Sequence, residues 1–394
     1  MPASLTPFLV MYAFQERMGL KKVYGLALDT PMERIDPWGG LELKDYEHLF
    51  KSFGLQAFPG EWNRKLHHAL FERSMVVAHR DFGSVLERIQ SKKPFINMTG
   101  IASSGKLHLG HKADIDLFAF FKSQAHARNY FCIADIDGYV SRPDEKVASL
   151  EKAKEFAVGN LSHALALGLN EKDAYVQSQA SPAYYAFAFS LSKKITANMH
   201  EAIYGHVEFG KIAANLLQMA DILHGQLEEF EGPLPSITGI GLDQDPHARL
   251  ARDLARRALP NGFLPSFIYF KHQGGLLEGQ KMSSSKPDTA IYLDDSQEQI
   301  ARKIQRAFTG GKPTAKEQRE QGANPDICRV CEILRFHYPN TKKLYERLDA
   351  YRKGDILDGE NKAFTIEFVQ GMLKKHQELA AKKQKIAERM VHGS

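Results

Sequence analysis

Apolar runs of strand length alternate with longer helical patterns through the middle of this 394-residue chain. Each run is followed directly by Gly, Asp or Ser; the four runs are Phe95–Thr99, Tyr130–Ala134, Ala174–Gln177 and Ser236–Ile240. Strands separated by helices predict a parallel sheet that is covered by helices. The pattern therefore predicts an α/β fold for this part of the chain.

Long helical patterns interrupt the alternation between residues 145 and 225. Glu151–Leu167 and Phe187–His200 are the clearest of them, because their apolar positions recur at a helical spacing. We interpret residues 145–225 as a helical insertion between two halves of a nucleotide-binding fold.

The two ends of the chain differ from the middle. Residues 1–90 predict an irregular lead-in with a turn at Asp36–Gly40, followed by helices at Leu43–Phe53 and Asn63–Arg73. No strand pattern follows residue 296. Four helical patterns occur there instead, at Gln299–Phe308, Arg329–Tyr338, Lys342–Tyr351 and Lys362–Met390. The predicted domains are 1–90, an α/β domain at 91–295 and an α-helical domain at 296–394.

The charge of the chain is concentrated near its C-terminus. The whole chain has a net charge of +5, with 52 Lys and Arg against 47 Asp and Glu. Residues 300–394 hold 20 of the basic and 12 of the acidic residues, which leaves residues 1–299 slightly acidic. A basic end on a near-neutral body is typical of an enzyme that holds a polyanion there. A solvated helical face would have the same composition.

Cysteine usage and hydropathy indicate a protein of a reducing compartment. The three cysteines Cys132, Cys328 and Cys331 are too few for a disulfide framework, so we expect a cytoplasmic location. The apolar stretch Leu5–Phe14 is short, has no cationic lead, and is followed by charged residues. We therefore expect neither a signal peptide nor a membrane span.

The first motif with candidate chemistry follows the apolar stretch at 94–100. Residues 104–111 read Ser-Gly-Lys-Leu-His-Leu-Gly-His, so His108 and His111 would lie on one face of the first helical turn. The free amides and the dipole at a helix N-terminus favour phosphate. Two imidazoles there could stabilise negative charge that develops on a phosphate. Two hydrogen-bonded histidines at a helix start would show the same spacing.

The second motif lies in a glycine-rich context. Residues 281–285 read Lys-Met-Ser-Ser-Ser, with glycines at positions 274, 275 and 279. A lysine could contact the β- and γ-phosphates of a nucleotide while the hydroxyls of Ser283, Ser284 and Ser285 donate hydrogen bonds. Without the first motif, a serine-rich surface turn is the simpler interpretation.

Together the two motifs resemble the HIGH and KMSKS signatures of class I aminoacyl-tRNA synthetases. This resemblance implies a Rossmann-like, doubly wound parallel sheet that binds its ligand at the carboxyl ends of the strands. It implies ATP and Mg²⁺ as cofactors, His108, His111 and Lys281 as catalytic residues, and the domain at 296–394 as the anticodon-binding domain. By position, the implied ATP-binding residues are Gly100, Ser104, Gly110, Gly241, Asp243, Met282, Ser283, Ser284 and Ser285.

Further segments are similar to the tryptophanyl-tRNA synthetases of archaea and eukaryotes. They are Asp36–Gly39, Ala78–Phe82, Leu242–His247, Arg249–Asp253, Thr309–Gly311 and His376–Gln377. The resemblance implies activation of L-tryptophan, transfer to tRNA(Trp) and a homodimer formed through the insertion helices.

The residues expected to recognise the amino acid do not all match one group of tryptophanyl-tRNA synthetases. Where the eukaryotic enzymes have a Tyr and a Gln that help to read the indole, this chain has Met98 and Cys132. Gln218–Leu223 resembles the bacterial segment whose Asp accepts the indole N–H, so we predict that Asp221 reads the side chain. A charge on the helix surface is the alternative for Asp221. Asp137, Gln218 and Gln244 are the candidates for the α-ammonium group, which needs a carboxylate and oriented carbonyls.

Cys328 and Cys331 form an isolated Cys-x-x-Cys. A zinc site needs two more ligands, and the nearest candidate is His337. We therefore interpret both cysteines as ordinary helix residues and predict no metal site.

Three other functions are weighed against tryptophan activation. Tyrosyl-tRNA synthetase is favoured by Asp135–Tyr139 and disfavoured by Leu242–His247. An HxGH-type adenylyltransferase predicts neither the second motif nor a basic helical C-terminus. An inactive RNA-binding paralogue would not need His108, His111 and Lys281.

Overall fold

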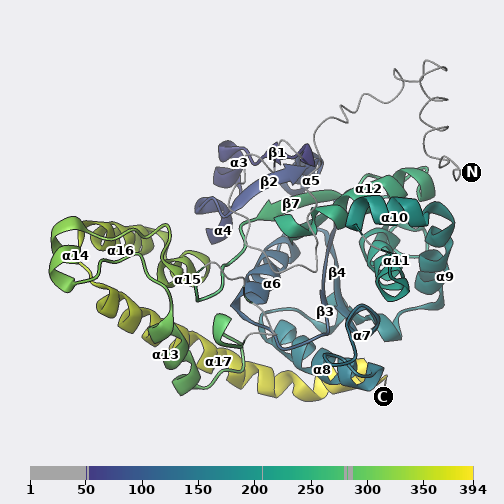
Figure 1. The fold of residues 1–394 in the computed structure, drawn as a ribbon. Helices are drawn as coiled ribbons and strands as arrows, with labels where there is room; N and C mark the ends of the chain where they lie inside the picture. Colours follow the sequence, from purple (N-terminus) through teal and green to yellow (C-terminus); the bar gives the residue numbers. More distant parts are fainter. Residues whose placement is uncertain (1–49, 51–52, 206, 279–281, 283–286, 394) are drawn as a thin grey trace, which may run out of the picture. The chain divides into compact units, whose positions relative to one another are not determined.

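A mixed sheet of seven strands forms the centre of the described chain (Figure 1). The computed structural model describes residues 50, 53–205, 207–278, 282 and 287–393, and these belong to one compact unit. The strands are β1 (Gln56–Ala57), β2 (Val76–Arg80), β3 (Phe95–Ala102), β4 (Ala127–Ala134), β5 (Ala174–Val176), β6 (Ser236–Gly241) and β7 (Ser266–Phe270). Their order across the sheet is β1-β2-β7-β6-β3-β4-β5.

Five neighbouring strands are parallel and form the doubly wound part of the sheet. From β3 the chain winds outward through β4 and β5, then returns to β6 on the other side of β3 and continues to β7. The carboxyl ends of β3 and β6 therefore flank the point where the winding direction reverses, which is where such sheets bind ligands. All four predicted strands are present, and the predicted fold class is confirmed.

Two antiparallel strands extend the sheet beyond β7, and the sequence analysis missed them. β2 pairs with β7, and β1 pairs with β2. The prediction that only helices follow the lead-in before residue 90 is therefore wrong. The strand β2 ends in the polar residues His79 and Arg80, which hid its pattern; Arg80 binds the buried Asp245 with Nε at 3.0 Å from Oδ1.

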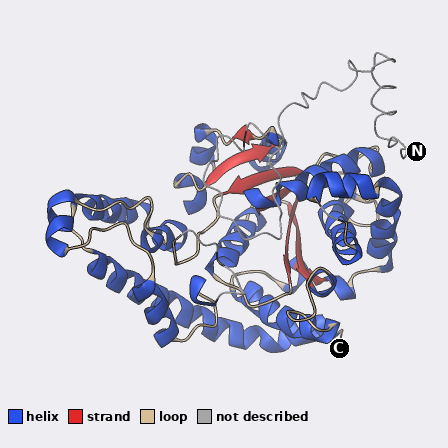
Figure 2. Ribbon diagram, in the orientation of Figure 1, coloured by secondary structure: helices blue, strands red, loops and turns tan. Residues whose placement is uncertain are grey.

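Helices cover both faces of the sheet, as Figure 2 shows in blue around the red strands. Before β3 they are α3 (Gly60–Lys65), α4 (Ala69–Glu72) and α5 (Phe82–Gln90). Between β3 and β7 they are α6 (Leu109–Lys122), α7 (Asp135–Val140), α8 (Leu150–Ala166), α9 (Pro182–Leu191), α10 (Ala197–Tyr204), α11 (Phe209–Leu223) and α12 (Asp245–Ala258). The turn at 36–40 and most of the predicted helix 43–53 lie outside the described residues.

Alternation along β7 shows how both faces are buried. Ile268 packs into a cluster with Leu117 and Phe121 of α6, whereas Phe267 and Tyr269 pack into a second cluster with α9, α11 and α12. Successive side chains of a strand point to opposite faces, so a strand covered by helices on both sides is apolar throughout. The described insertion contributes α8 to α11, but it also contains β5.

The predicted helix Phe187–His200 is two helices. α9 ends at Leu191 and a 3-10 turn follows at Ser192–Lys194. The hydroxyl of Thr196 then accepts a hydrogen bond from the Met199 N–H at 3.2 Å and caps the start of α10. A threonine in an N-cap position satisfies a free amide of a new helix, so the chain turns where the apolar pattern alone suggests continuity.

The described residues after 296 contain helices and no strand, as predicted. They form α13 (Gln297–Arg306), α14 (Ala315–Gln321), α15 (Arg329–His337), α16 (Thr341–Lys353) and α17 (Asp358–His392). The 35-residue α17 packs along α8 and α13 (Figure 1). Its Leu373 shares an apolar cluster with Leu161 of α8. Within the described part of the chain, no helix is long and apolar enough to cross a membrane.

Candidate active site

A cavity of about 600 Å³ opens at the carboxyl ends of β3, β4 and β6. Every predicted site residue that the structure describes lines it: Met98, Gly100, Ser104, His108, Gly110, His111, Cys132, Asp137, Gln218, Asp221, Gly241, Asp243, Gln244 and Met282. These residues come from positions far apart in the sequence. The sheet brings them together at the point where its winding reverses.

The two histidines of the first motif stack on each other at the start of α6. His108 is the N-cap residue, and its ring centroid lies 3.8 Å from that of His111, with the planes 27° apart. The His108 backbone N–H donates to Nδ1 of His111 at 3.2 Å, so the neutral His111 ring carries its proton on Nε2. Gly110 permits this stacking, because a Cβ there would lie 3.0 Å from the His108 ring.

Of the second motif the structure describes Met282. Its side chain is buried, lines the cavity, and shares an apolar cluster with Leu107 and Leu109 of the first motif. The other predicted residues of this motif, Lys281, Ser283, Ser284 and Ser285, lie outside the described residues.

The chain that follows the second motif pairs with the first motif. The Leu109 N–H donates to the Ile291 carbonyl at 3.0 Å, and the Leu293 N–H donates to the Leu107 carbonyl at 2.9 Å. His108 and Tyr292 form an antiparallel bridge between these hydrogen bonds. The first motif therefore lies beside the segment that follows the second motif, which their separation in the sequence does not show.

Asp221 is buried at the base of the cavity. It belongs to α11, and its Oδ1 accepts hydrogen bonds from the hydroxyls of Tyr175 at 2.7 Å and Tyr184 at 2.6 Å. Its Oδ2 accepts from Nε2 of Gln177 at 3.0 Å. Burial raises the pKa of Asp221 to about 6, and the hydrogen bonds limit that rise. The alternative that Asp221 is a charge on the helix surface is wrong.

An apolar wall stands beside this carboxylate. Met98 and Cys132 are 3% and 1% exposed, and they pack with Ala134 on one face of β3 and β4. Burial, with the neighbouring Asp221 carboxylate as a second cause, raises the pKa of the Cys132 thiol well above its usual range. The thiol is thus a neutral, soft surface that suits a flat ring.

Gln177 connects the base of the cavity with its polar rim. Its Oε1 accepts from the Asp137 backbone N–H at 2.9 Å, while its Nε2 donates to Asp221. Burial raises the pKa of the Asp137 carboxyl, and the nearby Ser141 and Arg142 oppose the rise. Gln218 lies one helical turn before Asp221 on α11, and it lines the cavity together with Asp137.

The other end of the cavity is formed by the turn after β6. Asp243 is hydrogen-bonded to Nε2 of His272, and Gln244 donates to Asp243 at 3.2 Å. A Cβ on Gly241 would lie 2.2 Å from the His272 ring. A side chain at position 241 would therefore displace His272 from Asp243.

Sequence reasoning missed several residues of the cavity. Arg142 and Lys146 line it from the segment after α7, and His272 lines it from the segment after β7. Tyr184 is a buried core residue whose hydroxyl also donates to Asp221. No local pattern reveals these residues, because each depends on where a distant element packs.

Cys328 and Cys331 are buried thiols of α15. Cys328 is the N-cap residue, and its Sγ accepts from the Cys331 N–H at 3.4 Å. His337 binds Gln273 instead, with Nε2 at 2.9 Å from Oε1. In the described ranges, no group of three His, Cys, Asp or Glu residues could hold a metal ion.

Comparison with known proteins gives one consistent family. The model of the class I tRNA synthetases (W and Y) matches residues 90–374. The chain is 37% identical over 370 residues to the tryptophan–tRNA ligase of Aeropyrum pernix, covering 91% of this chain and 98% of that protein. It is 35% identical to the tryptophan–tRNA ligase of Methanocaldococcus jannaschii, with the same coverage. The crystal structure of the Aeropyrum pernix tryptophanyl-tRNA synthetase superposes with a TM-score of 0.80 at 36% identity, covering 90% of this chain and 98% of that one.

Proposed function

Since the chain belongs to the class I tRNA synthetases of the tryptophan and tyrosine type, we propose that it joins L-tryptophan to tRNA(Trp) at the expense of ATP. The observation that carries this proposal is the cavity in which the stacked His108 and His111 and the buried Asp221 all take part. The relatives that this chain matches over almost their whole length are tryptophan–tRNA ligases, so tyrosine is not favoured as the substrate.

The proposed reaction has two steps. A carboxylate oxygen of tryptophan attacks the α-phosphorus of ATP, the bond from that phosphorus to the bridging oxygen breaks, and pyrophosphate leaves. A hydroxyl at the 3′ end of the tRNA then attacks the carbonyl carbon of the adenylate and releases AMP. The first step forms a bond from the carboxylate oxygen to phosphorus, and the second exchanges the carbonyl carbon's bond to AMP for a bond to the tRNA oxygen, whose proton is released; neither step changes an oxidation state.

His108 and His111 stabilise the charge that develops on the α-phosphate. Nε2–H of His111 is a donor, because its Nδ1 accepts from the His108 backbone. The rings stand at the N-terminus of α6, where the helix dipole also favours an anion. Lys281, with the hydroxyls of Ser283, Ser284 and Ser285, acts on the β- and γ-phosphates in the proposed mechanism.

The remaining ATP contacts surround adenosine. Gly100 and Ser104 offer backbone and hydroxyl groups at the end of β3, and Gly110 and Met282 lie beside the histidine pair. Gly241 and Asp243 hold the ribose, whose hydroxyl groups can donate to a carboxylate.

Asp221 recognises the indole N–H of tryptophan. Indole is a donor only, so it needs an acceptor, and the buried carboxylate of Asp221 is an acceptor that lines the cavity. Met98 and Cys132 form the wall against the ring. Asp137, Gln218 and Gln244 receive the α-ammonium group.

Mg²⁺ accompanies ATP in this proposal. Mg²⁺ in such sites is held largely by nucleotide phosphates and water. When bound, it would neutralise charge on the departing pyrophosphate.

We further propose a cytoplasmic homodimer that binds tRNA with its C-terminal helices. α9 and α11 pack together and expose two large apolar side chains, Phe189 at 72% and Phe209 at 89%. Aromatic residues are enriched in protein interfaces, so we propose that these two side chains belong to the dimer interface. The basic domain at 296–394 is the proposed anticodon-binding domain, and the free cysteines suit a reducing compartment.

Amino-acid-dependent ATP–pyrophosphate exchange across the twenty amino acids tests this function. We expect exchange with tryptophan alone. Exchange with tyrosine would keep the mechanism and overturn the specificity, whereas exchange with no amino acid would favour an adenylyltransferase or an inactive paralogue.

A further inference from the structure

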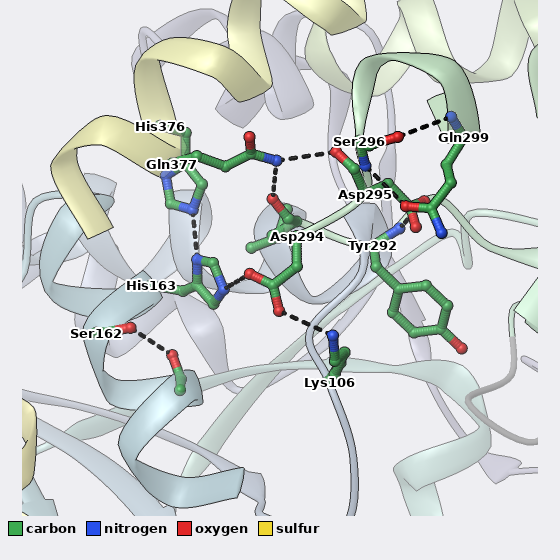
Figure 3. A network of polar contacts seen from close by, with 12 residues as sticks. Lys106, Ser162, His163, Tyr292, Asp294, Asp295, Ser296, Gln299, His376 and Gln377 are labelled. Atoms are coloured by element: carbon green, nitrogen blue, oxygen red, sulfur yellow. Dashed lines mark hydrogen bonds and ion pairs between the residues drawn. The ribbon is translucent and has the colours of Figure 1, made fainter. Parts of the chain in front are cut away.

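A series of polar side chains in contact with one another connects helix α17 with Lys106 of the first motif, at the cavity (Figure 3). The series runs from His376 on α17 through His163 on α8 and Asp294 to Lys106, which lines the cavity within the first motif. None of these four residues takes part in the reaction as proposed above.

We propose that Lys106 is a further ATP phosphate-binding residue, and that His163, His376 and Asp294 are positioning residues that direct it into the cavity. This inference rests on the proposed function for the identity of the nucleotide. These side chains would connect α17, in the C-terminal helical segment, with the site of adenylation.

Lys106 has the position that a phosphate ligand requires. It lies two residues before His108, at the N-terminal side of α6, and its side chain is 61% exposed. Its Nζ stands 3.6 Å from Oδ2 of Asp294, which is too long for a firm hydrogen bond. The ammonium group is therefore directed by Asp294 and still able to contact an incoming anion.

Asp294 is fixed by α17 from both sides. Gln377 donates to the carbonyls of Leu293 at 2.8 Å and Asp295 at 3.0 Å, which are the residues flanking Asp294. The same segment pairs with the first motif through Leu107 and Leu293. The backbone of Asp294 thus has a set position relative to Lys106.

The two histidines orient the Asp294 carboxylate. His163 Nε2 lies 2.8 Å from Oδ1 of Asp294, and His163 Nδ1 lies 2.8 Å from Nε2 of His376. A carboxylate can only accept, so His163 carries its proton on Nε2, and its Nδ1 is an acceptor in the neutral ring. The proton between the two rings is then on Nε2 of His376, which donates to His163 Nδ1. Both rings are buried, at 4% and 5% exposure, so their hydrogen bonds compete little with water.

Electrostatics agree with this geometry. The hydrogen bond from His163 lowers the pKa of Asp294 most, and burial opposes it; the electrostatic effects of His163 and then of Lys106 lower the pKa further, so the carboxylate stays ionised at neutral pH. Burial lowers the pKa of His376 to about 4 and keeps that ring neutral. A lysine side chain loses considerable rotamer freedom when it is held in place, and an oriented carboxylate restricts that freedom before ATP arrives.

Equilibrium binding of ATP without amino acid, measured by calorimetry beside ATP–pyrophosphate exchange, tests the proposal. We expect Lys106→Ala to weaken ATP binding about 10-fold and to leave the KM for tryptophan unchanged. His376→Ala and Asp294→Asn should weaken it about 3- to 5-fold. Adding His376→Ala to Lys106→Ala should cost nothing more, because the two act through one group. His376→Gln should restore binding, since its amide can donate to His163.

Matched controls separate positioning from loss of fold. Thr365→Val removes a buried hydrogen bond of α17 to the Asn361 carbonyl and should lower the melting temperature without changing ATP affinity. Lys152→Ala is the control for the loss of a cation, because it removes an exposed lysine of α8 outside the cavity. ATP affinity should stay unchanged in this variant. Asp294 is 42% exposed, so Asp294→Asn reports on the proposal even if His376→Ala does not fold.

Three results would overturn the proposal. They are unchanged ATP affinity in Lys106→Ala, independent and multiplicative effects of Lys106→Ala and His376→Ala, or equal effects of His376→Ala on ATP and tryptophan. ATP binding without exchange for the unaltered protein would instead count against the proposed function, and the affinities would still decide the role of Lys106.

Discussion

At the scale of single residues, Asp221 is the residue that we propose selects the amino acid. Its carboxylate is held by two tyrosine hydroxyls and one amide, in an environment that raises its pKa to about 6. A protonated carboxyl group would present a donor where the indole N–H needs an acceptor. We therefore expect tryptophan to bind the ionised state, which predominates above pH 6.

A pH dependence of tryptophan affinity follows from this state. As the pH falls through about 6, Asp221 takes up a proton and the Kd for tryptophan should rise about 10-fold per pH unit. Fluorescence titration between pH 5 and 8 measures it. Asp221→Asn should bind tryptophan more weakly at all pH values, with no inflection near 6; an unchanged inflection in that variant would assign the titration to another group.

The stacked histidines should affect the rate more than binding. Since in the proposed mechanism they stabilise charge that develops only during adenylation, His108→Ala and His111→Ala should each lower the kcat of ATP–pyrophosphate exchange about 10²- to 10³-fold, with small changes in KM. His67→Ala is the matched control, because His67 is exposed and lies outside the cavity. A rise in the KM for ATP at constant kcat would show ground-state binding instead.

The residues that line the cavity could largely be predicted from the sequence. The residues that hold Asp221 in place could not. His108, Gly110 and His111 form a local motif whose chemistry depends on spacing alone. Tyr175, Gln177 and Tyr184 meet around Asp221 only because β5, the turn after it and α9 pack against α11. Their contacts are a property of tertiary structure.

At the scale of elements, short helices placed tightly against strands carry the site. α7 brings Asp137 to the cavity, and it can do so because Gly138 touches the chain just after β3. A Cβ at position 138 would lie 2.7 Å from the carbonyl carbon and oxygen of Ser103. Backbone atoms cannot yield as a side chain can, so α7 itself would have to move.

Gly138→Ala should therefore damage both fold and function. We expect a loss of about 1–3 kcal/mol in the free energy of unfolding and a higher KM for tryptophan, because Asp137 is displaced. Gly159→Ala is the control, since nothing lies within 4 Å of a Cβ there and the residue is inside α8. That control should raise stability by up to about 1 kcal/mol; urea unfolding distinguishes the two, and equal stabilities would contradict the packing described for α7.

Elements were predicted where one periodicity dominates. β3, β4 and β6 are apolar runs between turn residues, and α17 is a long, mostly uninterrupted helical pattern. β2 was missed because Arg80 belongs to an ion pair with Asp245 and a bond to the Tyr269 hydroxyl, partners that lie more than 160 positions later. The predicted helix 187–200 was too long, because the side chain of Thr196 caps a second helix within it and the polarity pattern does not show this break.

At the scale of the whole molecule, the proposed dimer depends on the exposed phenylalanines of the insertion. Burial of Phe189 and Phe209 in an interface would remove large apolar surfaces from water. The double variant Phe189→Glu/Phe209→Glu should therefore sediment as a monomer at micromolar concentration where the unaltered chain sediments as a dimer.

An equally apolar position elsewhere provides the control. Leu379 on α17 is 46% exposed and lies outside the insertion, so Leu379→Glu should leave the sedimentation coefficient unchanged. A dimer that survives the double substitution would place the interface on another surface.

The central claim is that this chain charges tRNA(Trp) with tryptophan and uses Asp221 to select it. The most direct measurement is aminoacylation of tRNA(Trp) and tRNA(Tyr) transcripts with tryptophan and with tyrosine, by the unaltered chain and by Asp221→Asn. We predict tryptophan on tRNA(Trp) only, and about a 10- to 150-fold lower kcat/KM for the variant, the effect of losing a charged hydrogen-bond acceptor. Tyrosine on tRNA(Tyr), or an Asp221→Asn variant as active as the unaltered chain, would contradict the account.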